Sequence, residues 1–139
     1  MKKILVATDG APESDKALEW AANAARGNGA EVMVVYAVED FCPVALDEVD
    51  CNTIRSLMDK ESRNVVEAAV KKLSSWGIAA QGRIARGEPV EAIVALAKEE
   101  KADEIIAYSH GRKGLAKILK GSVTARLAEE APCPVTLIK

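Results

Sequence analysis

The chain has few cysteines and no long apolar run, and both absences limit the class of protein to which it can belong. Its three cysteines, Cys42, Cys51 and Cys133, show neither C-x-x-C spacing nor an even count. This pattern favours reduced thiols over a disulfide framework or a zinc site. The first apolar run, Ile4 to Ala7, is too short for a signal-peptide core, and no later run approaches the length of a membrane span. We therefore expect a soluble, cytoplasmic protein without membrane contacts or a metal site.

Common phosphate-binding and hydrolase motifs are absent as well. The chain has no G-x-x-x-x-G-K-[ST] segment, which argues against a P-loop enzyme, and no G-x-G-x-x-G segment after its first apolar run, which argues against a dinucleotide-binding domain. His110, Ser122 and Asp9 have the residue types of a base, a nucleophile and an orienting acid. No G-x-S-x-G elbow surrounds Ser122, however, and a triad is defined by geometry. We expect no catalytic residues.

The net charge is small, but positive charge is concentrated in one segment. Nineteen basic and twenty-one acidic residues give a formal charge of −2. The segment from Ser109 to Ala128 contributes +5 to this total, and the remaining residues contribute −7. A local basic patch on a balanced chain favours a small anionic ligand over a nucleic-acid duplex. The alternative is a solvated lysine-rich loop. The five cations are Arg112, Lys113, Lys117, Lys120 and Arg126.

Apolar runs typical of buried strands alternate with segments of helical periodicity along the whole chain. The expected strands are Lys3 to Thr8, Glu31 to Val38, Gln81 to Ala85, Glu104 to Tyr108 and Val135 to Ile138. The expected helices begin at Ser14 or Asp15, at about Asn52, near Pro89 and at Ser122, and the first two end at Gly27 and Gly77. This order predicts one α/β domain, residues 1–139, with an open, mostly parallel five-stranded sheet and helices on both faces.

Polar residues follow the first and fourth expected strands. Thr8 and Asp9 end the first strand, and the segment Y-S-H-G-R-K-G-L-A-K-I-L-K-G-S runs from Tyr108 to Ser122 after the fourth. A glycine turn followed by Gly-Ser at the start of a helix presents backbone N–H groups to a phosphate. If these strands are central neighbours, both stretches face one crevice. The plainer alternatives are a turn at Asp9, a helix N-cap at Ser122 and a loop hydrogen bond at His110.

These residues resemble the universal stress protein family, whose members carry an acid after the first strand and a G-x-x-G-x9-G-[ST] motif near the C-terminus. The similar segments are KILVATDG, GEPVEAIV and ADEIIAYSHGRKGLAKILKGSVTARLAEEAPCPVTLIK, so the resemblance covers nearly the whole chain. It implies a Rossmann-like or flavodoxin-like fold of the adenine nucleotide alpha hydrolase type, with strand order 3-2-1-4-5. It further implies a homodimer that supports survival under stress and binds ATP, with Mg²⁺, or AMP, with at most slow ATP hydrolysis.

The resemblance also implies a set of nucleotide-binding residues. Asp9 would contact the nucleoside, while Ala7 and Ala37 would border the base. Four residues of the C-terminal motif would surround the phosphates: Gly111, Gly121, Ser122 and Val123. The implied site also includes Thr8, Tyr108, Ser109 and His110.

One residue departs from the family motif, because Tyr108 stands where the first glycine of the motif belongs. A glycine there would permit close approach of a ligand. The ring obstructs the sugar site, stacks on the base, or packs within the sheet, and we favour obstruction. Two function hypotheses therefore remain: a nucleotide-binding regulatory protein, and a ligand-free dimeric interaction protein whose pocket Tyr108 has altered.

The resemblance places the last strand, Val135 to Ile138, at an edge of the sheet. Because an uncovered apolar edge invites pairing with another chain, we expect a two-fold homodimer through this strand. Trp20 and Trp76 are expected to pack on helix faces.

Overall fold

The computed structural model describes residues 2–39, 48–108 and 121–139. Five parallel strands form one sheet in the order β3-β2-β1-β4-β5, which confirms the expected topology. The strands are β1 (Lys3–Ala7), β2 (Glu31–Val38), β3 (Ala80–Arg86), β4 (Glu104–Tyr108) and β5 (Val135–Ile138). The helices are the 3-10 turn η1 (Pro12–Ser14), α1 (Asp15–Asn28), α2 (Glu48–Ser75), α3 (Pro89–Glu100) and α5 (Gly121–Glu130).

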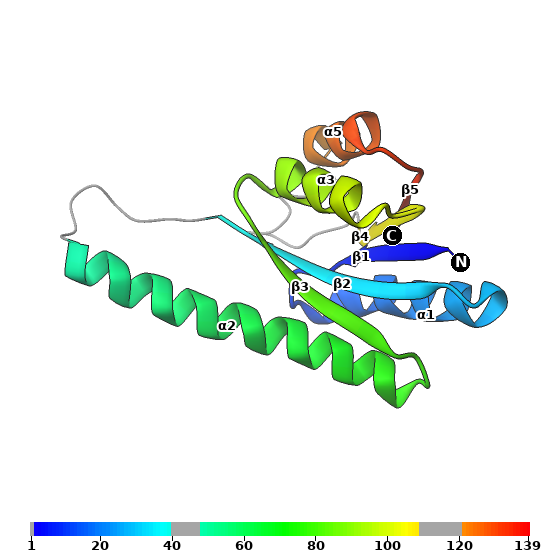
Figure 1. The fold of residues 1–139 in the computed structure, drawn as a ribbon, viewed down its shortest axis with the longest axis horizontal. Coiled ribbons are helices and arrows are strands. Elements are labelled where there is room, and N and C mark those ends of the chain that lie inside the picture. The colour runs from blue at the N-terminus through cyan, green and yellow to red at the C-terminus, as the bar shows by residue number, and fades with distance from the viewer. Residues whose placement is uncertain (1, 40–47, 109–120) are drawn as a thin grey trace.

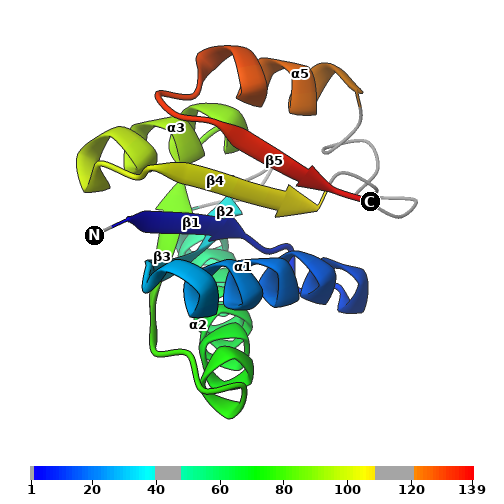
Figure 2. The same ribbon diagram turned by 90° about the vertical axis from the view of Figure 1, so that its right-hand side faces the viewer.

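The helices form one layer on each face of the sheet (Figures 1 and 2). Helices α1 and α2 cover one face, and α3 and α5 cover the other. Alternation along β1 divides the core between them: Ile4 and Val6 pack toward α1, whereas Leu5 packs toward α3. Because the central strands are buried on both faces, they appear in the sequence as continuous apolar runs.

Strand order reverses between β1 and β4, where the ligand crevice of an open α/β sheet forms. The chain leaves β1 toward the α1 face, and α5, the next described helix after β4, lies on the α3 face (Figure 2). The helices that follow the two strands therefore lie in different layers, and no single layer covers both carboxyl ends. The sequence predicts a crevice at this place, beyond the carboxyl ends of β1 and β4.

Several local expectations need correction. Helix α2 begins at Glu48, before the expected Asn52, and β3 is longer at both ends. Trp76 packs against the α1 side of the core, but Trp20 is 52% exposed and does not pack as expected. Cys51 is disulfide-bonded, contrary to the expectation of three reduced thiols, and Cys133 is free. The third cysteine, Cys42, lies outside the described residues.

None of the helices within the described ranges has the length and apolar character that a membrane-spanning segment requires.

Candidate functional site

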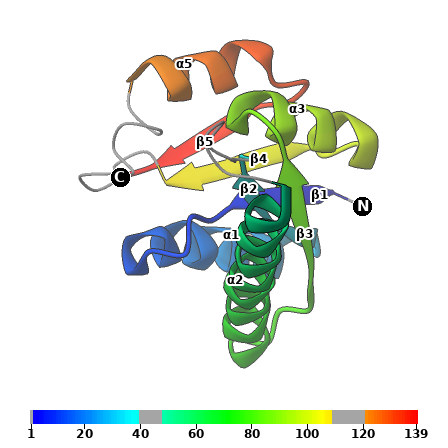
Figure 3. The same cartoon turned by 90° about the vertical axis from the view of Figure 1, so that its left-hand side faces the viewer.

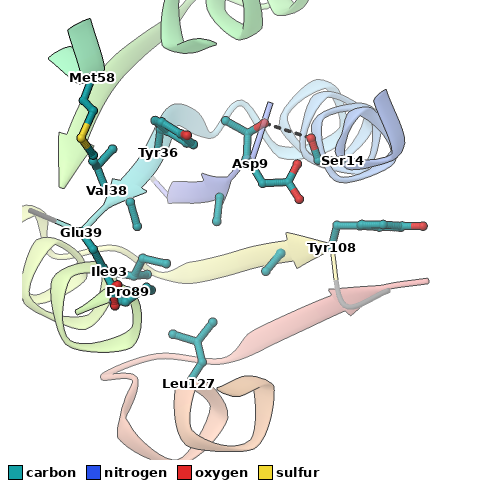
Figure 4. Close-up of a pocket in the computed structure, with 14 residues that line it drawn as sticks. Asp9, Ser14, Tyr36, Val38, Glu39, Met58, Pro89, Ile93, Tyr108 and Leu127 are labelled. Atoms are coloured by element: carbon teal, nitrogen blue, oxygen red, sulfur yellow. Dashed lines mark hydrogen bonds between the residues drawn. The ribbon is translucent and has the colours of Figure 1, made fainter. Parts of the chain in front are cut away.

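A cavity of about 340 Å³ opens beyond the carboxyl ends of β1, β2 and β4 (Figure 4). Small apolar side chains of the three strands form its floor, and α3 and α5 close one side. Polar groups stand mainly on the segment that follows β1. The lining residues are Ala7, Thr8, Asp9, Ser14, Tyr36, Ala37, Val38, Glu39, Met58, Pro89, Ile93, Ala107, Tyr108 and Leu127.

Hydrogen bonds fix the segment that carries Asp9. The Ser14 hydroxyl donates to the Ala11 carbonyl at 2.7 Å, so Thr8 Oγ1 must be the donor in its 3.0 Å contact with Ser14 Oγ. Thr8 Oγ1 in turn accepts from the Gly10 N–H at 3.2 Å. Gly10 has φ of +82°, a conformation that glycine adopts without strain. Ser14 is 1% exposed, so this network holds the loop from inside the protein.

One oxygen of the Asp9 carboxylate accepts a hydrogen bond within this loop, and the other accepts none from the described residues. Asp9 Oδ1 accepts from the Ala11 N–H at 2.8 Å, which is the turn-forming bond expected of an aspartate before glycine. No described residue donates a hydrogen bond to Asp9 Oδ2. Figure 4 shows the carboxylate extending past the end of β1. The turn-forming role and a ligand-binding role are therefore compatible at this residue.

Tyr108 packs within the sheet rather than filling the cavity. It is 5% exposed and belongs to the core cluster on the α1 side, with Val6 and Ile106. The neighbouring Ala107 belongs to the opposite face of the sheet, with Ile93 and Leu127. In Figure 4 the ring of Tyr108 points away from Leu127 and Met58. This packing supports the alternative that Tyr108 packs within the sheet, while the obstructing ring stays a prediction, because Tyr108 is also one of the residues that line the cavity.

The backbone of Ala37 lies on an open strand edge. Pairing of β1 with β2 ends at Ala7 and Val35, and the Thr8 N–H makes the last bond, to the Val35 carbonyl. Strand β2 continues to Val38, whose carbonyl accepts from the Gly87 N–H on the β3 side. Because alternate residues of a parallel strand bond to alternate neighbours, the N–H and C=O of Ala37 point toward the side that β1 has left. Both groups therefore face the cavity.

Tyr36 is a lining residue that the sequence did not indicate. Partial burial raises the pKa of its phenol, and the negative charges of Glu61 and Asp9 raise it further. The phenol therefore stays protonated beside Asp9. Its position follows from the extension of β2 beyond β1, which the sequence of β2 alone does not show.

Helix α5 packs against α3 through the buried Leu127, and an ion pair to one carboxylate also joins the two helices. Glu88 is the N-cap of α3, and its Oε2 accepts from the Glu91 N–H at 2.8 Å. Its Oε1 accepts from Arg126 Nη1 of α5 at 3.1 Å, while Arg126 Nε donates to Glu130. The cap bond from Glu91 is the main cause that lowers the pKa of Glu88, and the Arg126 guanidinium lowers it further. Leu127 lines the cavity, and the first turn of α5 lies toward the carboxyl end of β4 (Figure 2).

Five of the candidate site residues from the sequence lie together in this cavity: Ala7, Thr8, Asp9, Ala37 and Tyr108. Gly121, Ser122 and Val123 form the first turn of α5. Ser109, His110 and Gly111 lie outside the described residues. The sequence analysis missed Met58, Pro89, Ile93 and Leu127, which come from helices after distant strands. The apolar periodicity of Met58 and Ile93 indicated only core packing, and Pro89 indicated only a helix start.

The described part of the chain contains no group of three or more histidine, cysteine or acidic side chains arranged to hold a metal ion.

An open parallel sheet with a crevice at the switch between β1 and β4 defines an α/β fold, and in folds of this class small ligands bind at that position. The sequence model of the universal stress protein family matches residues 1–139, and the chain belongs to that family. Universal stress protein MJ0531 of Methanocaldococcus jannaschii is 34% identical over 139 residues, which cover 99% of this chain and 82% of that protein.

Two solved structures extend the comparison. A universal stress protein from Burkholderia pseudomallei is 28% identical, with a TM-score of 0.79 over 99% of this chain and 95% of that one. The universal stress protein from Archaeoglobus fulgidus in complex with dAMP is 25% identical, with a TM-score of 0.71 over 100% of this chain and 98% of that one. The family identification and the fold class expected from the sequence are confirmed.

Proposed function

We propose that this protein binds an adenine nucleotide in the cavity beyond β1, β2 and β4, and that it acts as a regulatory module in a stress response. The observation that carries the proposal is the open backbone edge at Ala37, which offers a donor and an acceptor to the cavity. Adenine presents the complementary pair, an acceptor at N1 and a donor at the 6-amino group. Guanine presents the reverse order, a donor at N1 and an acceptor at O6, and so does not match when the sugar lies at Asp9 and fixes the orientation of the base.

The rest of the cavity suits the sugar and the faces of the base. Apolar side chains such as Val38, Met58 and Ile93 border a slot next to Ala37. Across this slot, Asp9 Oδ2 accepts from a sugar hydroxyl, a charge-assisted hydrogen bond. A volume of about 340 Å³ lies at the small end of the range for ligand pockets. The cavity itself therefore holds the nucleoside.

The phosphates extend from the nucleoside toward α5. The helix begins at Gly121 with no acid in its first turn, and helix N-termini favour anions. Basic residues dominate the sequence before this helix. The dAMP complex of the Archaeoglobus fulgidus protein supports a nucleoside monophosphate in the same fold. AMP and ATP share the adenosine part, and Mg²⁺ would accompany ATP on its phosphates.

We further propose that the protein is a cytoplasmic homodimer paired through β5. This strand is an edge of the sheet, and its Leu137 is 39% exposed. The packing of the Tyr108 ring in the core on the α1 side of the sheet supports nucleotide binding over the alternative of a ligand-free interaction protein.

Titration calorimetry with AMP and GMP tests the base assignment. AMP should bind at least tenfold more tightly than GMP, because the wrong base leaves hydrogen-bonding groups of the site unpaired. Ultraviolet absorbance of the supernatant after denaturation detects nucleotide that copurifies with the protein. Equal affinities for AMP and GMP would contradict recognition by Ala37.

A cavity-filling variant tests the location. Ala107 is buried on the cavity side of β4, so Ala107→Leu should weaken AMP binding at least tenfold. The matched control is Ala95→Leu, at an exposed position of α3. Unchanged affinity in a folded Ala107→Leu protein would place the site elsewhere.

A further inference from the structure

The outer edge of β3 is a second open edge, on the far side of the sheet from β5. Strand β3 has only β2 beside it in the part of the chain that the structure describes. The Gly87 N–H bonds toward β2, so residues 81, 83 and 85 share that direction. The N–H and C=O groups of Gly82 and Ile84 therefore point outward. Gln81, Gly82 and Arg83 are exposed along this edge.

Helix α2 forms one wall beside this edge (Figures 1 and 3). A Cβ on Gly82 would lie 2.1 Å from Val66 Cγ1, so the helix approaches the strand closely and requires glycine there. A groove of about 440 Å³ runs between helix and strand. Its floor is apolar, and it is lined by Arg63, Val66, Glu67, Val70, Lys71, Gly82 and Ile84.

The charges of the groove have a definite pattern. Arg63 and Lys71 are exposed on α2, with Glu67 between them. Neither cation has an ion pair with the described residues, whereas Arg83 and Arg86 of the strand pair with Glu100 and Asp59. Arg63 and Lys71 therefore give the apolar groove a net positive charge, with one cation on each side of Glu67.

We propose that this groove and the edge of β3 bind an extended acidic segment of a partner protein by strand addition. The added strand satisfies the outward N–H and C=O groups of β3, which is a recurring mode of peptide recognition. Its side chains on the α2 side recur every second residue. An apolar side chain covers Val66 and Val70, and acidic side chains on either side of it pair with Arg63 and Lys71.

The spacing of the cations defines the motif. Eight helical residues span about 12 Å along the axis of α2. Four residues of a strand span about 13 Å. Acidic residues at positions 1 and 5 with an apolar residue at position 3 therefore match the groove. Glu67 disfavours an acid at the central position.

A labelled peptide tests this proposal on the intact protein. The probe is an acetylated, amidated heptapeptide, Thr-Glu-Thr-Val-Thr-Glu-Thr, with a fluorescent label on a flexible terminal spacer, and binding is measured by anisotropy. We expect saturable binding that moves the amide NMR signals of Gly82 and Ile84 and leaves those of β5 unmoved. A peptide with lysine in place of both glutamates should bind at least tenfold more weakly. Absent binding at millimolar peptide, or equal binding of the lysine peptide, would overturn the proposal.

Charge reversal on α2 supplies the second arm. The double variant Arg63→Glu and Lys71→Glu should weaken the peptide at least tenfold, while Lys16→Glu, an exposed cation on α1, should not. AMP affinity reports whether both variants remain folded with an intact cavity. If the double reversal instead converts a wild-type dimer to monomer in sedimentation velocity, the surface joins two copies of this chain, and an acidic partner is excluded.

Discussion

Asp9 combines two hydrogen-bonding roles that different substitutions separate. Oδ1 closes the turn with the Ala11 N–H, and Oδ2 is the proposed acceptor for a sugar hydroxyl. Asp9→Asn can keep the turn acceptor but replaces the second acceptor with an amide donor. Both Asp9→Asn and Asp9→Ala should weaken AMP binding by the equivalent of about 1.5 to 3 kcal/mol, the contribution of a hydrogen bond to a charged group.

Only Asp9→Ala should also lower the thermal midpoint, because it alone removes the turn bond. Calorimetry and thermal unfolding measure the two effects separately. The matched control is Glu99→Gln, which removes one exposed carboxylate from α3. Full AMP affinity in Asp9→Asn would show that Asp9 serves the turn alone.

Tyr108 should behave as a core residue. Tyr108→Gly should reduce the free energy of unfolding by about 3 kcal/mol or more, because it removes a buried aromatic ring. The same substitution should leave AMP affinity nearly unchanged, since the ring packs on the other face of the sheet. Tyr108→Phe should preserve both properties. Denaturant unfolding and calorimetry at low temperature measure the two, and a severalfold gain in affinity for Tyr108→Gly would restore the obstruction hypothesis.

At the scale of elements, the link between α3 and α5 should be sensitive to acid. Glu88 has a lowered pKa in the folded protein, so its ionised form stabilises the fold at pH values above the ordinary pKa of glutamate. That stabilisation is lost as the pH falls through the lowered value. The thermal midpoint of the native protein should therefore exceed that of Glu88→Gln at pH 7, and the difference should shrink at pH 3.

The Glu88→Gln comparison isolates the charge, because glutamine retains an acceptor for the Glu91 N–H. Glu99→Gln serves again as the control and should show no such dependence on pH. A constant difference between the native and Glu88→Gln midpoints across this range would mean that the charge of Glu88 does not hold the helices together.

The sequence predicted the bounds of secondary-structure elements best where burial requires apolar residues. The bounds of β2, β4 and β5 agree with the expected ones, and for the central strands β2 and β4 the reason is that burial in a parallel sheet requires largely apolar runs. Helix α2 begins before its apolar periodicity, so its start was missed. The packing of Tyr108 could not be read from the motif, because a motif gives a position along the chain, whereas strand alternation decides which face receives the side chain.

At the scale of the whole molecule, the open edge at β5 should control assembly. Pro134 accepts a bond from the Ile105 N–H on the β4 side, so the N–H of Leu137 points outward by alternation. Leu137→Pro removes this outward donor without removing a bond to β4. Sedimentation velocity should show a shift from dimer to monomer. Leu137→Ala is the control that truncates the side chain but keeps the donor, and a dimer that persists in a folded Leu137→Pro protein would place the interface elsewhere.

The extension of β2 past the end of β1 has a consequence for how this site can change during evolution. On the proposed assignment, the base is chosen by the N–H and C=O of Ala37, and every amino acid except proline supplies the same two groups. Substitution at position 37 alters the shape of the slot but leaves its preference for adenine intact. A change of preference requires an insertion or deletion that alters the relative lengths of two central strands. Specificity of this kind tolerates drift in sequence and is lost only by a rare class of mutation.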